Sequence, residues 1–225
     1  ELSQLDPDLG KNAANYYYYA RDNDLCISHS LHDPCMDKSL RPSQDPDRCV
    51  RVVKERDDGI IVRGARFNTF GLFSNEIFVM PTYRFIEGEE EFALWFTVPC
   101  NAPGLKQIAR ESFANRGTLD HPVSSRFDEI DSLVIFDDVF IPWERVYLSG
   151  DIELCNTLFV ATGSEAHMMH QVITKNVAKS EFLLGVACLM VESLGSGGIP
   201  QVQERVAELL GKAAGLFVPS GSLGN

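Results

Sequence analysis

The chain has 225 residues, of which 44% are hydrophobic, 10% aromatic and 23% charged, proportions typical of a globular protein that buries a sizeable core. Its formal net charge of -12 disfavours nucleic acid or an anionic membrane surface as a partner, because no cluster of lysine and arginine offsets it. No apolar run reaches the roughly 18 residues that a membrane-spanning helix needs, and the first residues do not resemble a signal peptide. We therefore expect a cytoplasmic protein with a small-molecule ligand, no membrane partner and no nucleic-acid partner.

The segment from Asn12 to Pro42 is denser in polar and aromatic side chains than an ordinary core segment. Four consecutive tyrosines, Tyr16 to Tyr19, would point all around a helix, so at least one phenol must face solvent or a polar site. The alternation of apolar and polar residues from Cys26 to Leu31 then predicts a half-buried strand with His29 between two serines. We interpret the segment as a wall that faces a ligand. The alternative for His29 is a structural histidine with satisfied hydrogen bonds.

β structure is predicted from about residue 48 to about residue 147. The stretches CVRVVKE and GIIVRGA are separated by Asp57-Asp58-Gly59, which is a hairpin turn signal. Further strands are predicted in NEIFVMPTYRF, FALWFTVP and DSLVIFDDVFIP, with breaks at Gly88, at Pro103-Gly104 and in the loop 116–125.

Helices are predicted from about residue 151 onward. Apolar residues recur at three- and four-residue spacing from Val172 to Leu194, and the sequence from Gly195 to Pro200 ends that helix. A second helix is predicted from Val202 to about Ala214. The pattern alone therefore gives an α+β fold class.

Six cysteines are scattered along the chain without a CxxC pair or a histidine-rich spacing, so we expect free thiols and no metal site. Cys188 lies in an apolar helical stretch and is expected to pack as a small hydrophobe. The six are Cys26, Cys35, Cys49, Cys100, Cys155 and Cys188.

Three blocks of sequence carry a resemblance to a known family. They are NAANYYYYARDNDLCISHSLHDPCMDKSLRP, RVVKERDDGIIVRGARFNTFG and HPVSSRFDEIDSLVIFDDVFIPWERV. In these blocks, and from about Leu9 to about Leu210, the chain resembles the oxygenase component of the 4-hydroxyphenylacetate 3-monooxygenase family. The resemblance implies an acyl-CoA dehydrogenase-like α+β fold, with a central β-barrel domain followed by the start of a C-terminal helical bundle.

The resemblance also implies how the chain is divided. Residues 1–33 would be the end of an N-terminal helical domain and a linker, residues 34–150 the central flavin-binding β-barrel domain, and residues 151–225 the start of a C-terminal helical domain. On this interpretation the chain looks like the middle of a longer enzyme.

Members of the family use reduced FAD (FADH2) and molecular oxygen to hydroxylate phenols through a C4a-hydroperoxyflavin. The resemblance therefore implies the oxygenase component of a two-component monooxygenase that acts on a phenolic substrate. It further implies a separate NAD(P)H:flavin reductase that supplies the reduced FAD, and a homo-oligomer, either a dimer or a tetramer. The sequence names neither the phenol nor the ring position that is hydroxylated.

The family's cofactor contacts fall on two parts of this sequence, and Lys38 stands where the family usually has an arginine. Lysine can still neutralise a flavin phosphate, although it lacks the forked geometry of arginine. The alternative for Asp37 and Lys38 is a solvated surface pair, and for Thr69 an ordinary strand threonine. The contacts implied are His29, Ser30, Leu31, Cys35, Met36, Asp37, Lys38 and Thr69.

For the phenol, the resemblance places His29 between the flavin and the substrate hydroxyl, and Thr82 on the substrate side. His167 and His170 are three residues apart at a helix start, and one of them corresponds to the base that activates the phenol in related enzymes. Which of the two it is stays open. The alternative is a partly exposed pair without a chemical role.

Two other functions are considered. One is a relative of 4-hydroxybutyryl-CoA dehydratase, whose iron-sulfur cluster has a histidine ligand followed seven residues later by a cysteine ligand; here Thr174 and Val177 occupy the positions seven after His167 and His170. The other is a non-catalytic remnant that binds flavin or forms oligomers, which the natural mass of the polypeptide would reveal.

Overall fold

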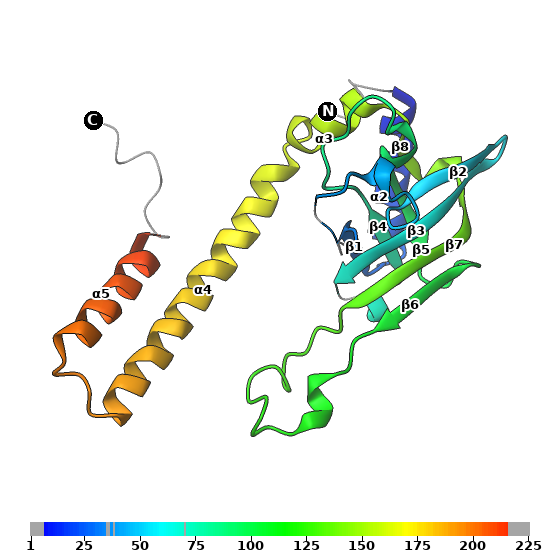
Figure 1. Ribbon diagram of the computed structural model, residues 1–225. Coiled ribbons are helices and arrows are strands. Elements are labelled where there is room, and N and C mark those ends of the chain that lie inside the picture. The colour runs from blue at the N-terminus through cyan, green and yellow to red at the C-terminus, as the bar shows by residue number, and fades with distance from the viewer. Residues whose placement is uncertain (1–6, 35–36, 38, 70, 216–225) are drawn as a thin grey trace, which may run out of the picture. The chain divides into compact units, whose positions relative to one another are not determined.

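The computed structural model of the protein describes residues 7–34, 37, 39–69 and 71–215 (Figure 1). The chain divides into two compact units, residues 1–162 and residues 163–225, and each unit is described by itself. No helix among the described residues is both long and apolar enough to cross a membrane. The domain boundaries inferred from the family, after residues 33 and 150, remain predictions.

The first unit is built on one mixed sheet of eight strands in the order β6-β7-β3-β1-β4-β5-β8, with β2 paired to β3 (Figure 1). Strands β1 and β4 are parallel, and the other pairs are antiparallel. The strands are β1 (Ile27–His32), β2 (Arg51–Arg56), β3 (Gly59–Thr69), β4 (Glu76–Val79), β5 (Leu94–Pro99), β6 (Leu105–Ala109), β7 (Ser132–Pro142) and β8 (Val146–Ser149).

The sheet is open within the described residues, so the predicted central β-barrel domain is here a mixed sheet that does not close into a barrel. Closure requires the two edge strands to pair with each other. Here β6 pairs only with β7, and β8 pairs only with β5. The α+β class and the strand that carries His29 are confirmed.

The predicted hairpin between β2 and β3 is confirmed, with Arg56 opposite Gly59 at its closed end. A Cβ atom on Gly59 would lie 2.2 Å from the carbonyl oxygen of Ile141, so the turn needs glycine for the close approach of β7. The alternation along β3 then directs its even-numbered residues inward, from Ile60 and Val62 to Asn68.

Helix α2 (Pro7–Asp22) contains the four tyrosines and packs against β8. The side-chain amide of Asn12 donates to the carbonyls of Trp143 at 3.0 Å and Val146 at 3.1 Å. Tyr16 is half-buried, whereas Tyr17, Tyr18 and Tyr19 are exposed. This confirms the prediction that at least one phenol of the run faces solvent.

Helix α3 (Ile152–Ala161) belongs to the first unit, because Cys155 and Leu158 are buried in a cluster with Phe92 and Trp95. The carboxylate of Asp151 caps the helix by accepting from the amide of Leu154 at 2.8 Å.

Between β6 and β7 the chain runs out beyond the end of the sheet (Figure 1). Arg110 and Asp128 close the base of this excursion with an ion pair at 2.5 Å. The Arg110 guanidinium, together with hydrogen bonds from Ser112 and the Phe113 amide, holds the pKa of Asp128 at about 2.

The second unit is a helical hairpin of α4 (Ser164–Ser193) and α5 (Pro200–Gly215) (Figure 1). The predicted helices and the break between them are confirmed, and Gly195 at the break has a φ of +59°. Cys188 is exposed, so the prediction that it packs is wrong for the described residues. The reason is that α4 has no buried residue and leaves its apolar side chains, such as Phe182 and Leu189, exposed.

Candidate functional site

The structure brings two residues of the predicted cofactor site together on neighbouring strands. His29 on β1 and Thr69 on β3 are direct partners in the antiparallel pairing of these strands. Side chains at directly opposed positions of an antiparallel pair have Cβ atoms about 4.5–5.5 Å apart and point to the same face. Both side chains are exposed, whereas their neighbours Ser28, Ser30 and Asn68 are buried. An imidazole and a hydroxyl therefore share one open face of the sheet.

An apolar hollow adjoins this pair. It has a volume of about 510 Å³ and lies where β3 and β6 end and β7 begins. Most of its exposed surface is apolar, and Phe67 and Ile108 are 49% and 58% exposed. The face thus combines polar groups with an apolar surface wide enough for a flat ring. The lining residues are Phe67, Asn68, Thr69, Ile108, Ala109, Arg110, Asp131, Ser132 and Leu133.

A buried polar chain on the reverse face fixes the strands that carry the pair. The Ser28 hydroxyl lies 2.9 Å from the hydroxyl of Ser74, and the Asn68 amide donates to Ser28 at 3.2 Å. The Ser30 hydroxyl donates to the carbonyl of Phe67 at 2.8 Å. These contacts join β1 to β3 and to the residues just before β4. Hydrogen bonds on the buried face of the sheet therefore fix the register between His29 and Thr69.

Two further residues predicted to contact the cofactor lie on β1. Ser30 is fully buried, its hydroxyl donates to the carbonyl of Phe67, and its own carbonyl accepts from the Met80 amide at 3.3 Å. Leu31 is partly exposed, and its carbonyl accepts from Arg66 at 3.1 Å.

Of the second group of predicted cofactor contacts, Cys35, Met36 and Lys38 lie outside the described residues. Asp37 is described, and its carboxylate accepts from the amide of Ser39 at 2.9 Å and from the Ser39 hydroxyl at 2.6 Å. These hydrogen bonds lower the pKa of Asp37. The residue is therefore an ionised, exposed group at the start of a turn.

The remaining predicted site residues do not join the pair within the first unit's sheet. Thr82 is exposed in the irregular segment that follows β4. His167 and His170 are exposed on the first turns of α4, in the second unit. The described residues include no group of three or more His, Cys, Asp or Glu side chains that could hold a metal ion.

The structure also shows a charged cluster under the tyrosine run that the sequence had not indicated. The Tyr16 hydroxyl donates to Oε2 of Glu76 at 2.8 Å, and Arg145 donates to the same oxygen at 2.5 Å. Burial and the Glu76 carboxylate raise the pKa of Tyr16. Tyr16 thus docks α2 onto the sheet, whereas the side chains of Tyr17, Tyr18 and Tyr19 are exposed on the surface.

A second buried charged pair was missed as well. Arg66 and Asp33 lie 3.1 Å apart, with side chains 2% and 1% exposed. Burial raises the pKa of Asp33, and the guanidiniums of Arg66 and Arg48 oppose that effect. The signal was present in the sequence, since Arg66 and Asn68 continue the inward-facing, even-numbered positions of the predicted strand GIIVRGA beyond its predicted end at Ala65.

Comparison with known proteins identifies the family. A family model described as 4-hydroxyphenylacetate 3-hydroxylase N terminal matches residues 1–148, and one described as the C terminal of the same protein matches residues 155–217. The chain belongs to the 4-hydroxyphenylacetate 3-hydroxylase family. The 4-hydroxyphenylacetate 3-monooxygenase oxygenase component of Thermus thermophilus is 43% identical over 206 residues, which are 90% of this chain and 43% of the relative.

Solved structures agree with the family and with the fold. An oxygenase component of 4-hydroxyphenylacetate 3-monooxygenase, complexed with FAD and 4-hydroxyphenylacetate, matches with a TM-score of 0.81 at 43% identity, over 93% of this chain and 44% of that chain. An archaeal 4-hydroxybutyryl-CoA dehydratase from N. maritimus matches with a TM-score of 0.77 at 25% identity, over 96% and 45%. A probable acyl-CoA dehydrogenase from Mycobacterium abscessus shares the fold, with a TM-score of 0.57 at 17% identity over 93% and 53%. The acyl-CoA dehydrogenase-like fold is thereby confirmed.

This chain spans less than half the length of the 4-hydroxyphenylacetate 3-hydroxylase relatives that it matches. The higher identity to the oxygenase components favours them over the dehydratase as the guide to chemistry.

Proposed function

We propose that the complete protein is the oxygenase component of a two-component monooxygenase, which hydroxylates a phenolic substrate with reduced FAD and molecular oxygen. The observation that carries this proposal is the 43% identity and TM-score of 0.81 to an oxygenase component complexed with FAD and 4-hydroxyphenylacetate. The chain covers 44% of that protein, so the remaining part of the substrate pocket would come from outside this chain.

The open face of the sheet fits a flavin. An isoalloxazine ring is flat and apolar on its faces and carries hydrogen-bonding atoms along one edge. His29 and Thr69 offer polar groups on one face, and the adjoining hollow of about 510 Å³ offers an apolar surface. Bound reduced flavin would supply the activation of oxygen, and the protein would supply position and exclusion of water.

Each residue then has a definite task. The Thr69 hydroxyl would hydrogen-bond the polar edge of the ring, which fixes the ring on the sheet. An imidazole N–H of His29 would donate a hydrogen bond to the oxygen of the substrate hydroxyl, which orients the phenol and stabilises the phenolate that forms when the base takes its proton. His167 or His170 would be the base that takes the phenol proton, as the resemblance implies. Thr82 would lie on the substrate side.

A separate NAD(P)H:flavin reductase would supply the reduced FAD, and we propose a homodimer or homotetramer as the assembly. The relatives support the separate reductase, because they are named as oxygenase components. Light scattering of the complete polypeptide would give its oligomeric state directly.

The test is a single-turnover reaction of the complete polypeptide with chemically reduced FAD, ¹⁸O₂ and a set of para-substituted phenols that includes 4-hydroxyphenylacetate. We expect a catechol that carries one ¹⁸O atom. The proposal would be contradicted if every phenol in the set gave one hydrogen peroxide per reduced FAD and no hydroxylated product. That result would favour a non-catalytic remnant.

A further inference from the structure

The segment that follows β1 carries predicted cofactor contacts. It comprises residues 33–40, of which 33, 34, 37, 39 and 40 are described, and none of these described residues lies in a helix or strand. A loop that contacts a ligand with no element of its own must be ordered by other side chains, or its ordering on binding lowers the affinity for the ligand. Two arginines from outside the segment contact its described residues.

The first is Arg66, which lies on β3 and is 2% exposed. Its Nη1 donates to the carbonyls of Leu31 at 3.1 Å and Met80 at 2.5 Å, and its Nε lies 3.1 Å from the Asp33 carboxylate. One guanidinium therefore joins the end of β1, the first residue of the segment and the chain that leaves β4.

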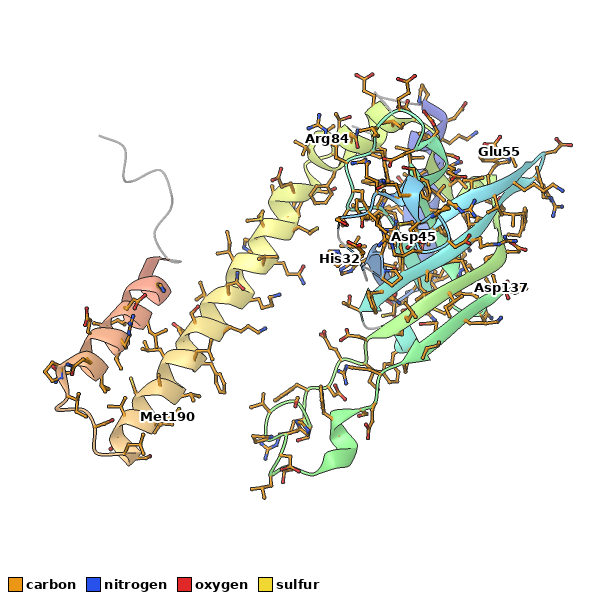
Figure 2. The ribbon with its side chains drawn as sticks, in the orientation of Figure 1. His32, Asp45, Glu55, Arg84, Asp137 and Met190 are labelled. Atoms are coloured by element: carbon orange, nitrogen blue, oxygen red, sulfur yellow. The ribbon has the colours of Figure 1, made fainter. Side chains whose placement is uncertain are left out.

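The second is Arg48, whose side chain is 7% exposed. Its Nη1 donates to the carbonyl of Asp37 at 2.9 Å, and its Nη2 donates to the carbonyl of Leu40 at 3.3 Å. Its Nε lies 3.7 Å from the carboxylate of Asp45. Figure 2 labels His32, the last residue of β1, which directly precedes the segment, and Asp45, the ion-pair partner of Arg48.

Backbone contacts bring together the two chain segments that carry Arg48 and Arg66. The Ala65 amide donates to the carbonyl of Arg48 at 3.4 Å. Gly64 has a φ of +131°, and a Cβ atom there would lie 2.2 Å from the carbonyl oxygen of Cys49. Only glycine at this position lets the chain that carries Arg48 approach β3 so closely.

A role in stability alone does not account for this arrangement. A buried ion pair is often no more stabilising than well-packed apolar residues of similar volume, because its desolvation is costly. Here the guanidiniums direct their donors to the main-chain carbonyls of Leu31, Asp37 and Leu40, all within or next to the segment. The flat fork of arginine suits this use, whereas lysine could not reach several carbonyls at fixed angles.

We propose that Arg66 and Arg48 are positioning residues for the flavin, which act by holding the main chain at Leu31, Asp37 and Leu40, so that Leu31 and Asp37, two of the predicted contacts, are presented to it. Neither is placed in contact with the cofactor. The proposal rests on the proposed function, since it takes the flavin as the ligand of that segment. It assigns a cofactor-related task to two buried side chains outside the predicted contact set.

The test compares Arg66→Lys and Arg48→Lys with the unaltered complete polypeptide. Lysine keeps the positive charge next to the buried Asp33 or the partly exposed Asp45, so each carboxylate keeps a partner while the fork is lost. Arg63→Lys is the matched control, because Arg63 is on the same strand and forms an exposed two-point pair with Asp138 at 2.9 Å. Two quantities are measured, the dissociation constant of reduced FAD under anaerobic conditions and the hydrogen exchange of peptides that cover residues 31–40.

We expect both test variants to bind reduced FAD about tenfold more weakly, since losing one hydrogen bond from a charged donor changes an equilibrium by about that factor. Exchange in residues 31–40 should accelerate in the ligand-free variants, while the rest of the sheet exchanges as before. Arg63→Lys should change neither quantity. If Arg66→Lys does not fold, Arg48→Lys alone decides the result.

Equal flavin affinity in the folded variants and the unaltered protein would overturn this inference and leave the proposed function standing. Failure of the unaltered protein to bind reduced FAD would overturn both. Tight binding that depends on the arginines, but without hydroxylation of any phenol, would uphold the inference and overturn only the proposed function.

Discussion

His29 and Thr69 are far apart in the chain, and the pairing of β1 with β3 makes them neighbours. The alternation of the sequence predicted that His29 lies on a half-buried strand, whereas the predicted strand GIIVRGA ended at Ala65, short of Thr69. It could not predict that these strands pair, because β1 is inserted between β3 and β4 and so depends on contacts distant in sequence. The family resemblance named both residues, and the structure supplies the shared face.

His29→Ala should uncouple the reaction. Without the imidazole the phenol is neither oriented nor polarised, so reduced flavin is oxidised without oxygen transfer. The hydrogen peroxide released per reduced FAD consumed is the quantity to measure, and it should rise while product falls. His32→Ala is the control, because His32 is exposed at the end of the same strand and has no predicted role. Unchanged coupling in His29→Ala would remove His29 from the mechanism.

Thr69→Val should weaken the binding of reduced FAD by a factor of about 2–10, the usual worth of one neutral hydrogen bond. Thr69→Ser keeps the hydroxyl and should bind like the unaltered protein. Anaerobic fluorescence titration measures both variants. Equal affinity for valine and serine at this position would show that the hydroxyl makes no contact with the flavin.

The buried charged side chains show what could not be predicted from the sequence at the scale of the residue. The positions of Arg66 and Asn68 on β3 were predictable from period-two alternation, but their partners were not. Asp33 lies in an irregular segment, and the carbonyls that Arg48 and Arg66 bind have no signature in the side-chain sequence. Buried polar partners of this kind follow from the fold, and so the fold had to be known first.

Among the elements, α2 is held to the sheet by Tyr16 in addition to Asn12, whose amide donates to the carbonyls of Trp143 and Val146. Tyr16 donates to Glu76 at 2.8 Å, and its ring lies 5.8 Å from that of Tyr147, with the two ring planes at 53°. The three tyrosines that follow have exposed side chains. A run of identical residues therefore divides into one docking residue and three surface residues, as the geometry of a helix requires.

Tyr16→Phe should lower the free energy of unfolding by about 1.5 kcal/mol, because it removes a hydrogen bond to a charged acceptor and leaves the ring packing intact. Tyr17→Phe is the matched control, since Tyr17 is 62% exposed and keeps its ring in the variant. Its effect should stay within about 0.5 kcal/mol, as for most surface substitutions. Urea denaturation of both variants measures the difference, and equal stability would show that the hydroxyl does not dock α2.

Element prediction succeeded where the signals were local. The hairpin turn Asp57-Asp58-Gly59, the long apolar periodicity that became α4 and the break at Gly195 all depend on residues close in the chain. Strand β6 was not predicted, because it is a short edge strand whose sequence, LKQIA, has no strict alternation. The expected closure into a barrel failed for a related reason, since edge pairing is a property of the whole sheet.

At the scale of the whole molecule, the two units contribute different parts of the proposed function. The first unit holds the sheet, the His29 and Thr69 pair and the two positioning arginines. The second unit is a helical hairpin with exposed apolar side chains and both candidate base histidines. Because the chain covers 43% of its Thermus relative, the complete polypeptide is the proper material for each functional test.

The measurement that tests the account most directly is an anaerobic titration of the complete polypeptide with reduced FAD, followed by flavin fluorescence, for the unaltered protein and for His29→Ala/Thr69→Val. We predict saturable binding with one flavin per chain, and binding weaker by a factor of about 2–10 in the double variant, as expected for the loss of the Thr69 hydrogen bond to the ring. No saturable binding by the unaltered protein, or the same affinity in both proteins, would contradict the assignment of this face to the flavin.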